Sequence, residues 1–395
     1  MEKSPGGDRP VHLWYWRGNF DWGMYLLVEP EAGETRIFCV QTPRGTQNPV
    51  IMDALRSINT IVRNRRAAIL IWLLSTLILT ACRSEKSLQE AKATRFAMGT
   101  IIEITVLDTT ADEANAALEA GFAEINRIAA LFWEGNPTGP LYAFNHRQTD
   151  AVAMPEEILD LLERSQTYSA RLQGAFDVTI GTILPLYSFK GDSLRPPAQT
   201  EIARLLPFIG YQSLILDREN ARLGARHRQT KIGLGAVAKG YGVDCALDAI
   251  VRCGVAGALV NAGGDLRTLA RQDGRKWRVG IQHPRATGEM FAVLEVDSLA
   301  VVTSGDYEKY FMFNGKRIHH LLNPCTGLPA DSCQSVTVIA PNAEQADAMA
   351  TGLFVLGAWE GMNALRKFPN CEALWINHDG QVIQSAGFGK FISKN

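Results

Sequence analysis

The sequence has no marked excess of charge of either sign, no internal repeat and no long run of like charges. Its 40 lysine and arginine residues are balanced by 41 aspartate and glutamate residues, which gives a net charge of −1 at pH 7. This balance argues against nucleic acid as a bulk electrostatic partner. A Cys-x-x-Cys motif is also absent, which argues against a structural zinc site.

Long apolar runs are scarce as well, and the strongest one lies near the front of the chain. Residues 63–82 read RNRRAAILIWLLSTLILTAC, in which three arginines precede an apolar stretch at 67–81. That stretch is shorter than the roughly 20 residues of a bilayer-spanning helix and suits the apolar region of a secretory signal. The ending LTAC resembles the lipobox of bacterial lipoproteins. We therefore expect 63–82 to be a lipoprotein signal peptide with Cys82 lipidated; the alternative is an uncleaved anchor, and both export the rest of the chain.

The position of this signal divides the chain. Because a signal peptide normally opens a protein, and Met52 lies at a natural starting distance, we expect residues 1–62 to be a mis-assigned start. A cytoplasmic extension outside the main fold is the alternative. Residues 83–94 are polar and predict a tether, and residues 95–395 predict one catalytic domain without internal linkers.

The cysteines of the exported part raise the question of disulfides. Cys325 and Cys333 flank a loop and could pair, because exported proteins can form disulfides. Cys245 and Cys253 are eight residues apart on an expected helix, too far along its axis for one bond.

The pattern of the exported part predicts an α+β fold. Apolar periodicity indicates helices at 111–132, 155–172 and 342–357. Strand patterns occur at 100–107 and, one after another without intervening helices, between 257 and 341, and a closing hairpin follows at 373–388. Consecutive strands favour a mainly antiparallel sheet with packed helices.

The segment GLGAVAKGYGVD, residues 233–244, has two glycines at the spacing of a phosphate-binding P-loop. It lacks the lysine and Ser/Thr that follow the second glycine of such a loop. A helix starting near Ala236 would still offer free backbone N–H groups to an anion, with Lys239 able to reach back to it. The alternative is that the glycines serve close helix packing.

Two further polar segments interrupt the strands. In VNAGGDLRT, residues 260–268, Asp265 could hold a ligand hydroxyl, or the segment could be a plain hairpin turn. His319 and His320 end another strand, on which they would point to opposite faces, so only one can face a given site. Histidine is the natural general base near neutral pH, although a single histidine is more often structural.

The segment ADAMATG, residues 346–352, carries the pattern of a magnesium site. Asp347 and Thr351 are four residues apart on an expected helix and share one face. A carboxylate and a hydroxyl near a backbone carbonyl are hard oxygen ligands of the kind Mg²⁺ prefers. The alternative is an aspartate near a helix N-terminus and a threonine bonded to its own helix.

Taken together and in order, these segments resemble one family, the ApbE family of FAD:protein FMN transferases. The likeness runs from Phe96 to the C-terminus, and a lipoprotein signal in front is usual for the family. The motifs that carry it are MGT, AFDVTIG, GAVAKGYGVD, LVNAGGD, VVTSGDYEKYF, HHLLNPCTGLP, SVTVIA and ADAMATGLFVLG.

The resemblance implies a T-fold-related single catalytic unit and a Mg²⁺-dependent reaction. The FMN half of FAD is transferred to a Thr or Ser hydroxyl of a partner protein, and AMP leaves. The implied catalytic residues are His320, as the base, and Lys239. The implied FAD neighbours are Met98, Ala175, Phe176, Asp177, Lys239 and Leu321, and the implied metal ligands are the carbonyl of Ala236 with Asp347 and Thr351.

Two positions depart from the family pattern. Gly233 stands where many members have an aspartate that contacts the cofactor, and Asn323 replaces an aspartate in the HLLNP segment. The first departure puts one cofactor contact in doubt but leaves the implied set of metal ligands complete.

The resemblance also implies the partners and the location. The acceptors would be flavoprotein subunits of membrane redox complexes: the Rnf type, the sodium-pumping NADH:quinone oxidoreductase, or a nitrous-oxide-reduction regulator. We therefore expect a protein anchored by lipid at the periplasmic face of the bacterial inner membrane. Two rival functions are an FAD pyrophosphatase, which would give free FMN and AMP, and a flavin-binding lipoprotein without turnover.

Overall fold

The chain divides into two compact units in a computed structural model, residues 1–85 and 86–395. The structure describes residues 12–16, 22–31, 34–43, 89–191 and 194–394. In the first unit, β1 (His12–Trp16), β2 (Trp22–Glu31) and β3 (Glu34–Pro43) form an antiparallel meander. The expected signal peptide and Cys82 lie outside the described residues. Within the described ranges, no helix combines the length and apolar character needed to span a bilayer.

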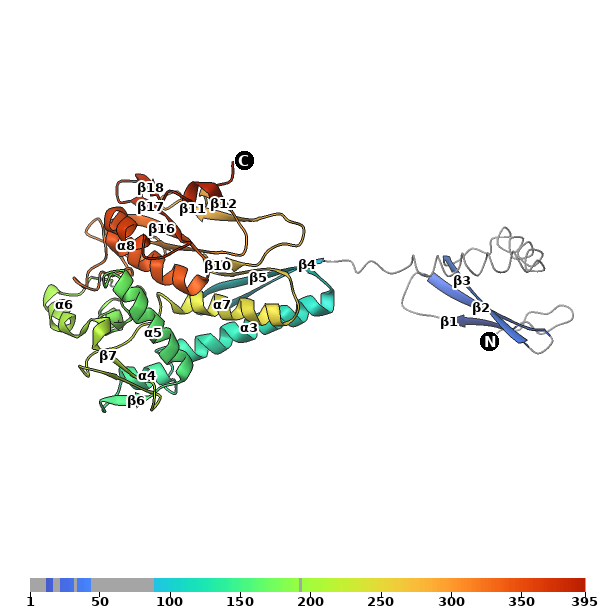
Figure 1. The fold of residues 1–395 in the computed structure, drawn as a ribbon, viewed down its shortest axis with the longest axis horizontal. Coiled ribbons are helices and arrows are strands. Elements are labelled where there is room, and N and C mark those ends of the chain that lie inside the picture. Colours follow the sequence, from blue (N-terminus) through green and yellow to red (C-terminus); the bar gives the residue numbers. More distant parts are fainter. Residues whose placement is uncertain (1–11, 17–21, 32–33, 44–88, 192–193, 395) are drawn as a thin grey trace. The chain divides into compact units, whose positions relative to one another are not determined.

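The second unit is built on an eight-stranded sheet in which all neighbouring strands are antiparallel, with the order β18-β17-β16-β13-β10-β9-β5-β4 (Figure 1). Its strands are β4 (Gln89–Ala97), β5 (Thr100–Thr109), β9 (Gly257–Ala262), β10 (Asp265–Thr268), β13 (Ala300–Gly305), β16 (Cys333–Ala340), β17 (Glu372–Asn377) and β18 (Val382–Gln384). Smaller antiparallel pieces are β11 (Trp277–Gln282) with β12 (Met290–Val296), β14 (Tyr310–Phe313) with β15 (Lys316–His319), and β6 (Ala151–Ala153), β8 (Arg222–Ala225) and β7 (Leu214–Asp217).

Long helices pack beside this sheet (Figure 1). Those that contact its strands are α3 (Ala111–Phe132), α7 (Ala238–Arg252) and α8 (Ala343–Leu365), whereas α5 (Glu156–Arg171) packs against α8. The shorter helices are α4 (Pro140–Asn145), α6 (Gln199–Leu205), η1 (Val178–Thr182), η2 (Leu184–Leu186), η3 (Leu206–Phe208), η4 (Tyr211–Ser213) and η5 (Phe388–Phe391). The expected α+β fold with a mainly antiparallel sheet is confirmed.

Alternation along the strands separates two apolar cores. On β13, Val302 belongs to the core under the helices, whereas its neighbour Val301 faces the core formed with β11 and β12. Trp375 and Leu374 divide in the same way on β17. This follows from the two-residue period of a strand, which sends successive side chains to opposite faces. The central strands of the sheet are therefore buried on both faces.

The region 83–94 was expected to be a tether, but its described residues form a strand. Residues 89–94 lie in β4, which pairs with β5 at the edge of the sheet. The sequence pattern did not reveal this strand because an edge strand has few buried apolar side chains. Lys92 and Thr94 are exposed, while Ala91 and Ala93 are half-buried.

The disulfide that Cys325 and Cys333 could form is not present in this structure, in which both thiols are free. Cys333 is buried at the start of β16, whereas Cys325 is exposed in the preceding turn. Flanking a loop in sequence therefore does not bring the two side chains together. Cys245, Cys253 and Cys371 are free as well.

Helix α8 is longer than the sequence predicted and is interrupted once. It continues to Leu365 through Gly357, whose φ of 74° is not helical. Because positive φ favours glycine, the chain can bend there while the apolar pattern carries on. The first half of α8, which carries Asp347 and Thr351, agrees with the expected helix.

Candidate functional site

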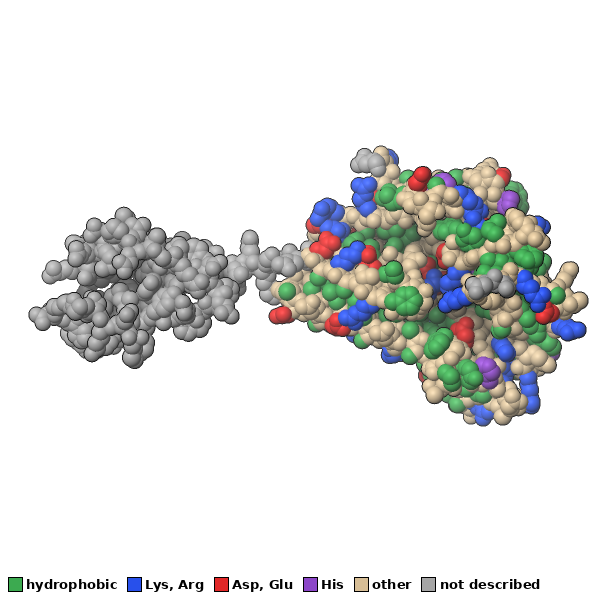
Figure 2. All heavy atoms as spheres, turned by 180° about the vertical axis from the view of Figure 1, so that it is seen from behind, with side chains coloured by type: hydrophobic (Ala, Val, Ile, Leu, Met, Phe, Trp, Pro, Cys, Tyr) green, Lys and Arg blue, Asp and Glu red, His purple; other side chains and the backbone are tan. Residues whose placement is uncertain are grey.

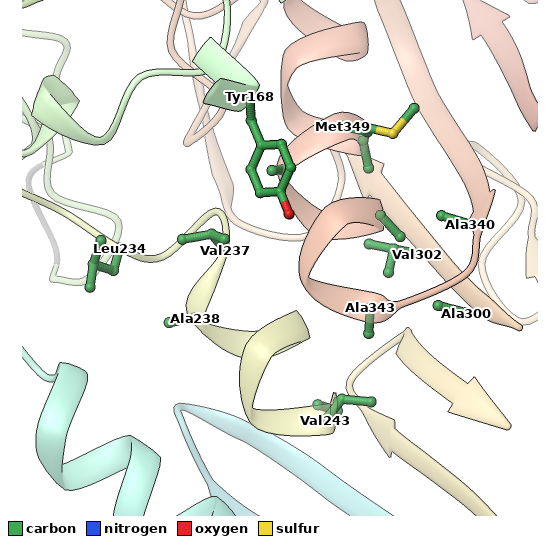
Figure 3. Close-up of a cluster of buried hydrophobic side chains, with 14 of the residues drawn as sticks. Tyr168, Leu234, Val237, Ala238, Val243, Ala300, Val302, Ala340, Ala343 and Met349 are labelled. Carbon is green, nitrogen blue, oxygen red and sulfur yellow. The ribbon is translucent and has the colours of Figure 1, made fainter. Parts of the chain in front are cut away.

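Helices α7 and α8 come very close together where each begins, and Gly240 is the reason they can. A Cβ at Gly240 would fall on the carbonyl oxygen of Ala343 and lie 2.9 Å from the Cβ of Asp347. Figure 3 shows apolar side chains from this region, including Val243 and Ala343, beside Ala300 and Ala340 of the sheet. At Gly240 the packing interpretation of the glycine-rich segment is therefore correct.

The helix of that segment starts two residues later than expected. The carbonyl of Leu234 accepts from the N–H groups of Val237 and Ala238, and α7 begins at Ala238. Ala236 therefore lies in the turn before the helix, half-buried, where its carbonyl is outside the helical ladder. Lys239 is the second helical residue, close to the positive end of the helix dipole.

Asp347 of α8 is bound directly to the start of α7. Its Oδ2 accepts a hydrogen bond of 3.0 Å from the backbone N–H of Gly240, and the side chain is almost fully buried. Burial, together with the negative charge of Asp265, raises the pKa of Asp347 to about 7. Thr351 follows one turn later and is half-buried, so both expected metal ligands of α8 stand on one helix face.

Lys239 forms an ion pair with Asp265, which β10 places at 1% exposure. Burial opposes the charge on Lys239, but the attraction of Asp265 and Asp347 outweighs it and keeps the pKa of the lysine above its usual range. The carboxylate expected to hold a ligand hydroxyl is thus the partner of the lysine. The sequence could not show this, because the two residues are 26 positions apart on different elements.

Glu308 is a charged residue of this site that the sequence analysis missed. It lies in the turn after β13, and its charge acts on both Lys239 and Asp347. Desolvation raises the pKa of its carboxyl, although the residue is exposed at the surface of the site, and the nearby Lys239 opposes that rise. Its only sequence signal is its place inside the VVTSGDYEKYF motif.

The charges around Lys239 favour a bound cation. Three carboxyl groups, on Asp265, Asp347 and Glu308, act on the half-buried Lys239, so their negative charge exceeds that of the lysine when all three are ionised. Among the described residues, no group of three His, Cys, Asp or Glu side chains is arranged to hold a metal ion. A metal here would therefore need the carbonyl of Ala236 and the hydroxyl of Thr351 beside Asp347, and this oxygen-only set fits Mg²⁺.

The structure separates the roles of the two histidines. His319 is buried, and both of its ring nitrogens are hydrogen-bonded within the protein. Its Nε2–H donates to the carbonyl of Ala330 at 2.8 Å, and its Nδ1 accepts from the N–H of Leu321 at 3.3 Å. His320 is half-buried, and its Nδ1 lies 3.3 Å from the carbonyl of Lys309. An Nδ1–H that donates to this carbonyl leaves Nε2 as a free proton acceptor.

The electrostatic surroundings keep His320 neutral. Burial, then the positive charge of Lys309, lower its pKa to about 3. Lys239 contributes to the same effect, which places His320 within electrostatic reach of the lysine site. His320 is therefore ready to accept a proton at any physiological pH, as a weak base.

The segment of Ala175, Phe176 and Asp177 is built into the protein interior. Phe176 is buried and meets Tyr168 edge to face. One carboxylate oxygen of Asp177 accepts from the N–H and hydroxyl of Thr179, and the other accepts from the N–H of Tyr211 at 2.7 Å. Asp177 thus shapes its own loop. Any ligand that reaches this carboxylate would share it with those three donors.

Met98 and Leu321 also contact protein. Met98 forms the turn between β4 and β5, with φ of 50°, and its Sδ lies 3.1 Å from where a Cβ of Gly242 on α7 would be. Leu321 is buried beside His320. Asn323 closes the next turn through a 2.9 Å bond from the N–H of Cys325 to its Oδ1, which an aspartate could equally accept.

Gly233, the position without the expected aspartate, packs against another backbone segment. Its N–H donates to the carbonyl of Val178, and an added Cβ would lie 3.0 Å from Leu184 Cδ1 and 3.2 Å from the Cα of Gly181. Close backbone packing therefore accounts for a glycine at this position.

Gly233→Asp is expected to lower the free energy of unfolding by about 1–3 kcal/mol, because it overpacks this contact, and to leave FAD binding no tighter. Urea unfolding and FAD titration measure the two effects. Gly235→Asp is the control, since Gly235 is exposed and an added Cβ there meets no atom within 4 Å. A Gly233→Asp protein that is as stable as the wild type and binds FAD more tightly would contradict the packing explanation.

Comparison with known proteins gives the family. The model of the ApbE family matches residues 98–375. An FAD:protein FMN transferase of Treponema pallidum is 31% identical over 326 residues, which cover 78% of this chain and 90% of the relative. One from Haemophilus influenzae is 30% identical and covers 80% of this chain and 95% of the relative.

Solved structures give the same result. The ApbE protein of Thermotoga maritima superposes with a TM-score of 0.72 at 32% identity and covers 78% of this chain and 100% of that chain. The apo form of the flavinyl transferase ApbE of Pseudomonas stutzeri has a TM-score of 0.68 at 26% identity, with 78% and 98% covered. From its motifs, fold and relatives, the chain belongs to the ApbE family.

Proposed function

We propose that this protein is an FAD:protein FMN transferase that requires Mg²⁺. One P–O bond of the FAD pyrophosphate breaks, a new P–O bond forms to a Thr or Ser hydroxyl of a partner protein, and AMP leaves. The observation that carries the proposal is the buried cluster in which Asp347 is bound to the N–H of Gly240 beside the Lys239–Asp265 pair. The names of the relatives support the same reaction.

Each residue of the site has a separate role in the proposed reaction. Lys239, at the start of α7, neutralises charge on the pyrophosphate, with Asp265 holding its ammonium group in place. Ala236, Asp347 and Thr351 would hold Mg²⁺, which supplies charge neutralisation at the phosphates. His320 accepts the proton of the incoming hydroxyl on Nε2, because its Nδ1 is directed to the carbonyl of Lys309.

A labelling experiment tests this function. The full-length protein is mixed with FAD, Mg²⁺ and candidate acceptor subunits, and flavin fluorescence is read from denaturing gels. Covalent labelling of an acceptor, lost when its target Thr or Ser is replaced by Ala, is the expected result. AMP and free FMN without labelled protein would instead make the protein an FAD pyrophosphatase. Bound FAD without any turnover would make it a flavin-binding lipoprotein.

We extend the proposal to partners and location. The acceptors are flavoprotein subunits of the Rnf type, of the sodium-pumping NADH:quinone oxidoreductase, or a nitrous-oxide-reduction regulator, and Cys82 anchors the protein by lipid at the periplasmic face of the inner membrane. The motivation is the apolar signal ending in LTAC at residues 79–82. Membrane fractionation after labelling with a fatty-acid analogue checks the anchor. Labelling that persists in Cys82→Ser would exclude this cysteine.

The affinity for Mg²⁺ is expected to fall as the pH is lowered through about 7. Asp347 must be ionised to bind a cation, and because its pKa is raised to about 7, protons compete with the metal below that pH. Below about pH 7 the apparent affinity should drop by up to roughly tenfold per pH unit. Transfer rates measured at pH 6 and pH 8 over a series of Mg²⁺ concentrations check this. A pH 6 rate that saturating Mg²⁺ does not restore would contradict the assignment.

A further inference from the structure

Asp244, which the reaction described above does not use, connects three elements of the fold through one carboxylate. It lies on α7, one turn after Gly240. Its Oδ1 accepts from the N–H of Ala343 and its Oδ2 from the N–H of Glu344, each at 2.9 Å. Arg267 on β10 donates from Nη1 to the same Oδ1, also at 2.9 Å. One side chain therefore joins α7, the first turn of α8, and β10.

These three elements carry the buried charges of the site. Lys239 is on α7, Asp347 is on α8 one turn after Ala343, and Asp265 is on β10 two residues before Arg267. Residues two apart on a strand point to the same face, so Asp265 and Arg267 both face the helices. A shift of α8 along α7 would break the bonds of Asp244 and would move Asp347 away from Lys239.

A second residue, Asn342, also stabilises the N-terminal end of α8. Asn342 is the local N-cap, with its Oδ1 accepting from the N–H of Gln345 at 2.9 Å. This bond lies within one element and does not reach α7. The helix therefore has two caps of different kinds: Asn342 satisfies its first turn locally, and Asp244 fixes where that turn sits.

Burial disfavours the ionised form of the Asp244 carboxylate. Burial raises its pKa, and the two backbone N–H groups and Arg267 oppose that rise. An uncharged local cap such as Asn342 satisfies backbone donors without burying a charge. A half-buried carboxylate thus stands where one side chain contacts both the second helix and the strand.

We infer that Asp244 is a positioning residue that holds α7, α8 and β10 in the arrangement that forms the cation site. The inference rests on the proposed function for the identity of the cation but concerns binding, not turnover. The bonds of Asp244 described above go to Ala343, Glu344 and Arg267, none of which is a proposed metal ligand. Removal of Asp244 should weaken Mg²⁺ binding by about 10–100-fold, the range seen when residues that orient metal ligands are lost.

The test compares Asp244→Ala with Asn342→Ala, which removes the local cap of the same helix turn. Mg²⁺ affinity is measured by titration calorimetry on the full-length protein below its unfolding transition, and urea midpoints give the loss of stability. The expected result is a Kd for Mg²⁺ raised at least about tenfold in Asp244→Ala and changed less than about twofold in Asn342→Ala. Equal changes in the two variants would overturn the positioning role.

A second pair keeps the inference testable if Asp244→Ala does not fold. Asp244→Asn retains one acceptor for α8 but loses the charge that holds Arg267, and Arg267→Gln weakens the link to β10 from the other side. Both should raise the Kd for Mg²⁺, and affinity unchanged in both would overturn the inference. A wild type that binds Mg²⁺ but labels no acceptor would refute the proposed function alone, whereas a wild type without Mg²⁺ affinity would refute both.

Discussion

Asp347→Asn is expected to reduce Mg²⁺-dependent FMN transfer by at least about 10²–10³-fold, and at the same time to make the metal-free protein more stable at pH 8. The transfer falls because an amide neutralises no charge on a cation. The stability rises because Asp347 is buried near Asp265, and its pKa, about 7, lies above the value of 3.8 usual for an aspartate. Asparagine can still accept from the N–H of Gly240, so the local structure is kept.

The sign of the stability change follows from proton binding. Between about pH 4 and pH 7 the folded wild type binds a proton at Asp347 that the unfolded chain releases, so the wild type loses stability as the pH rises through this window. The variant lacks this contribution from residue 347. The difference in free energy of unfolding should therefore grow towards pH 7 and level off above it, on the order of 2 kcal/mol.

Urea unfolding at pH 5 and pH 8, with and without Mg²⁺, measures this effect, and the labelling reaction measures transfer. Glu360→Gln on the exposed side of α8 is the matched control and should change neither. Full transfer in Asp347→Asn, with excess EDTA also harmless to the wild type, would exclude Asp347 as a metal ligand.

His320→Gln is expected to slow transfer by about 10²–10⁴-fold, the usual contribution of a general base, with little change in FAD affinity. Glutamine keeps a polar group at the position but cannot take up the proton of the acceptor hydroxyl. Because the pKa of His320 is lowered to about 3, the residue stays neutral down to pH 5. Its own protonation should therefore cause no loss of wild-type rate between pH 8 and pH 6.

Single-turnover labelling with preformed enzyme–FAD complex separates transfer from binding. His378→Gln, in the exposed turn after β17, should behave as wild type. His319→Gln should lose stability, since both ring nitrogens of His319 are bonded within the protein, while the transfer rate per folded molecule stays much closer to that of the wild type than in His320→Gln. A His320→Gln variant that loses FAD affinity but transfers normally once FAD is bound would disprove the base role.

Local periodicity allowed the elements to be predicted well. Helix α3 spans Ala111–Phe132 as expected, because its apolar positions recur on one face and Thr110 with Glu113 forms a capping box at its start. Strand β12 and the closing hairpin of β17 and β18 follow the alternation that predicted them. Strand β4 was missed, because an edge strand has little apolar surface to reveal it.

The sequence by itself determined the family, the antiparallel α+β class and the types of residue at the site, since ordered motifs and short-range periodicity are local properties of a chain. Only the tertiary structure decided which residues meet. It pairs Lys239 with Asp265, adds Glu308 to their charge, and leaves His320 rather than His319 with a free nitrogen. It also shows that Gly240 allows two helices to touch, because electrostatics and close packing depend on distances in space between residues far apart in sequence.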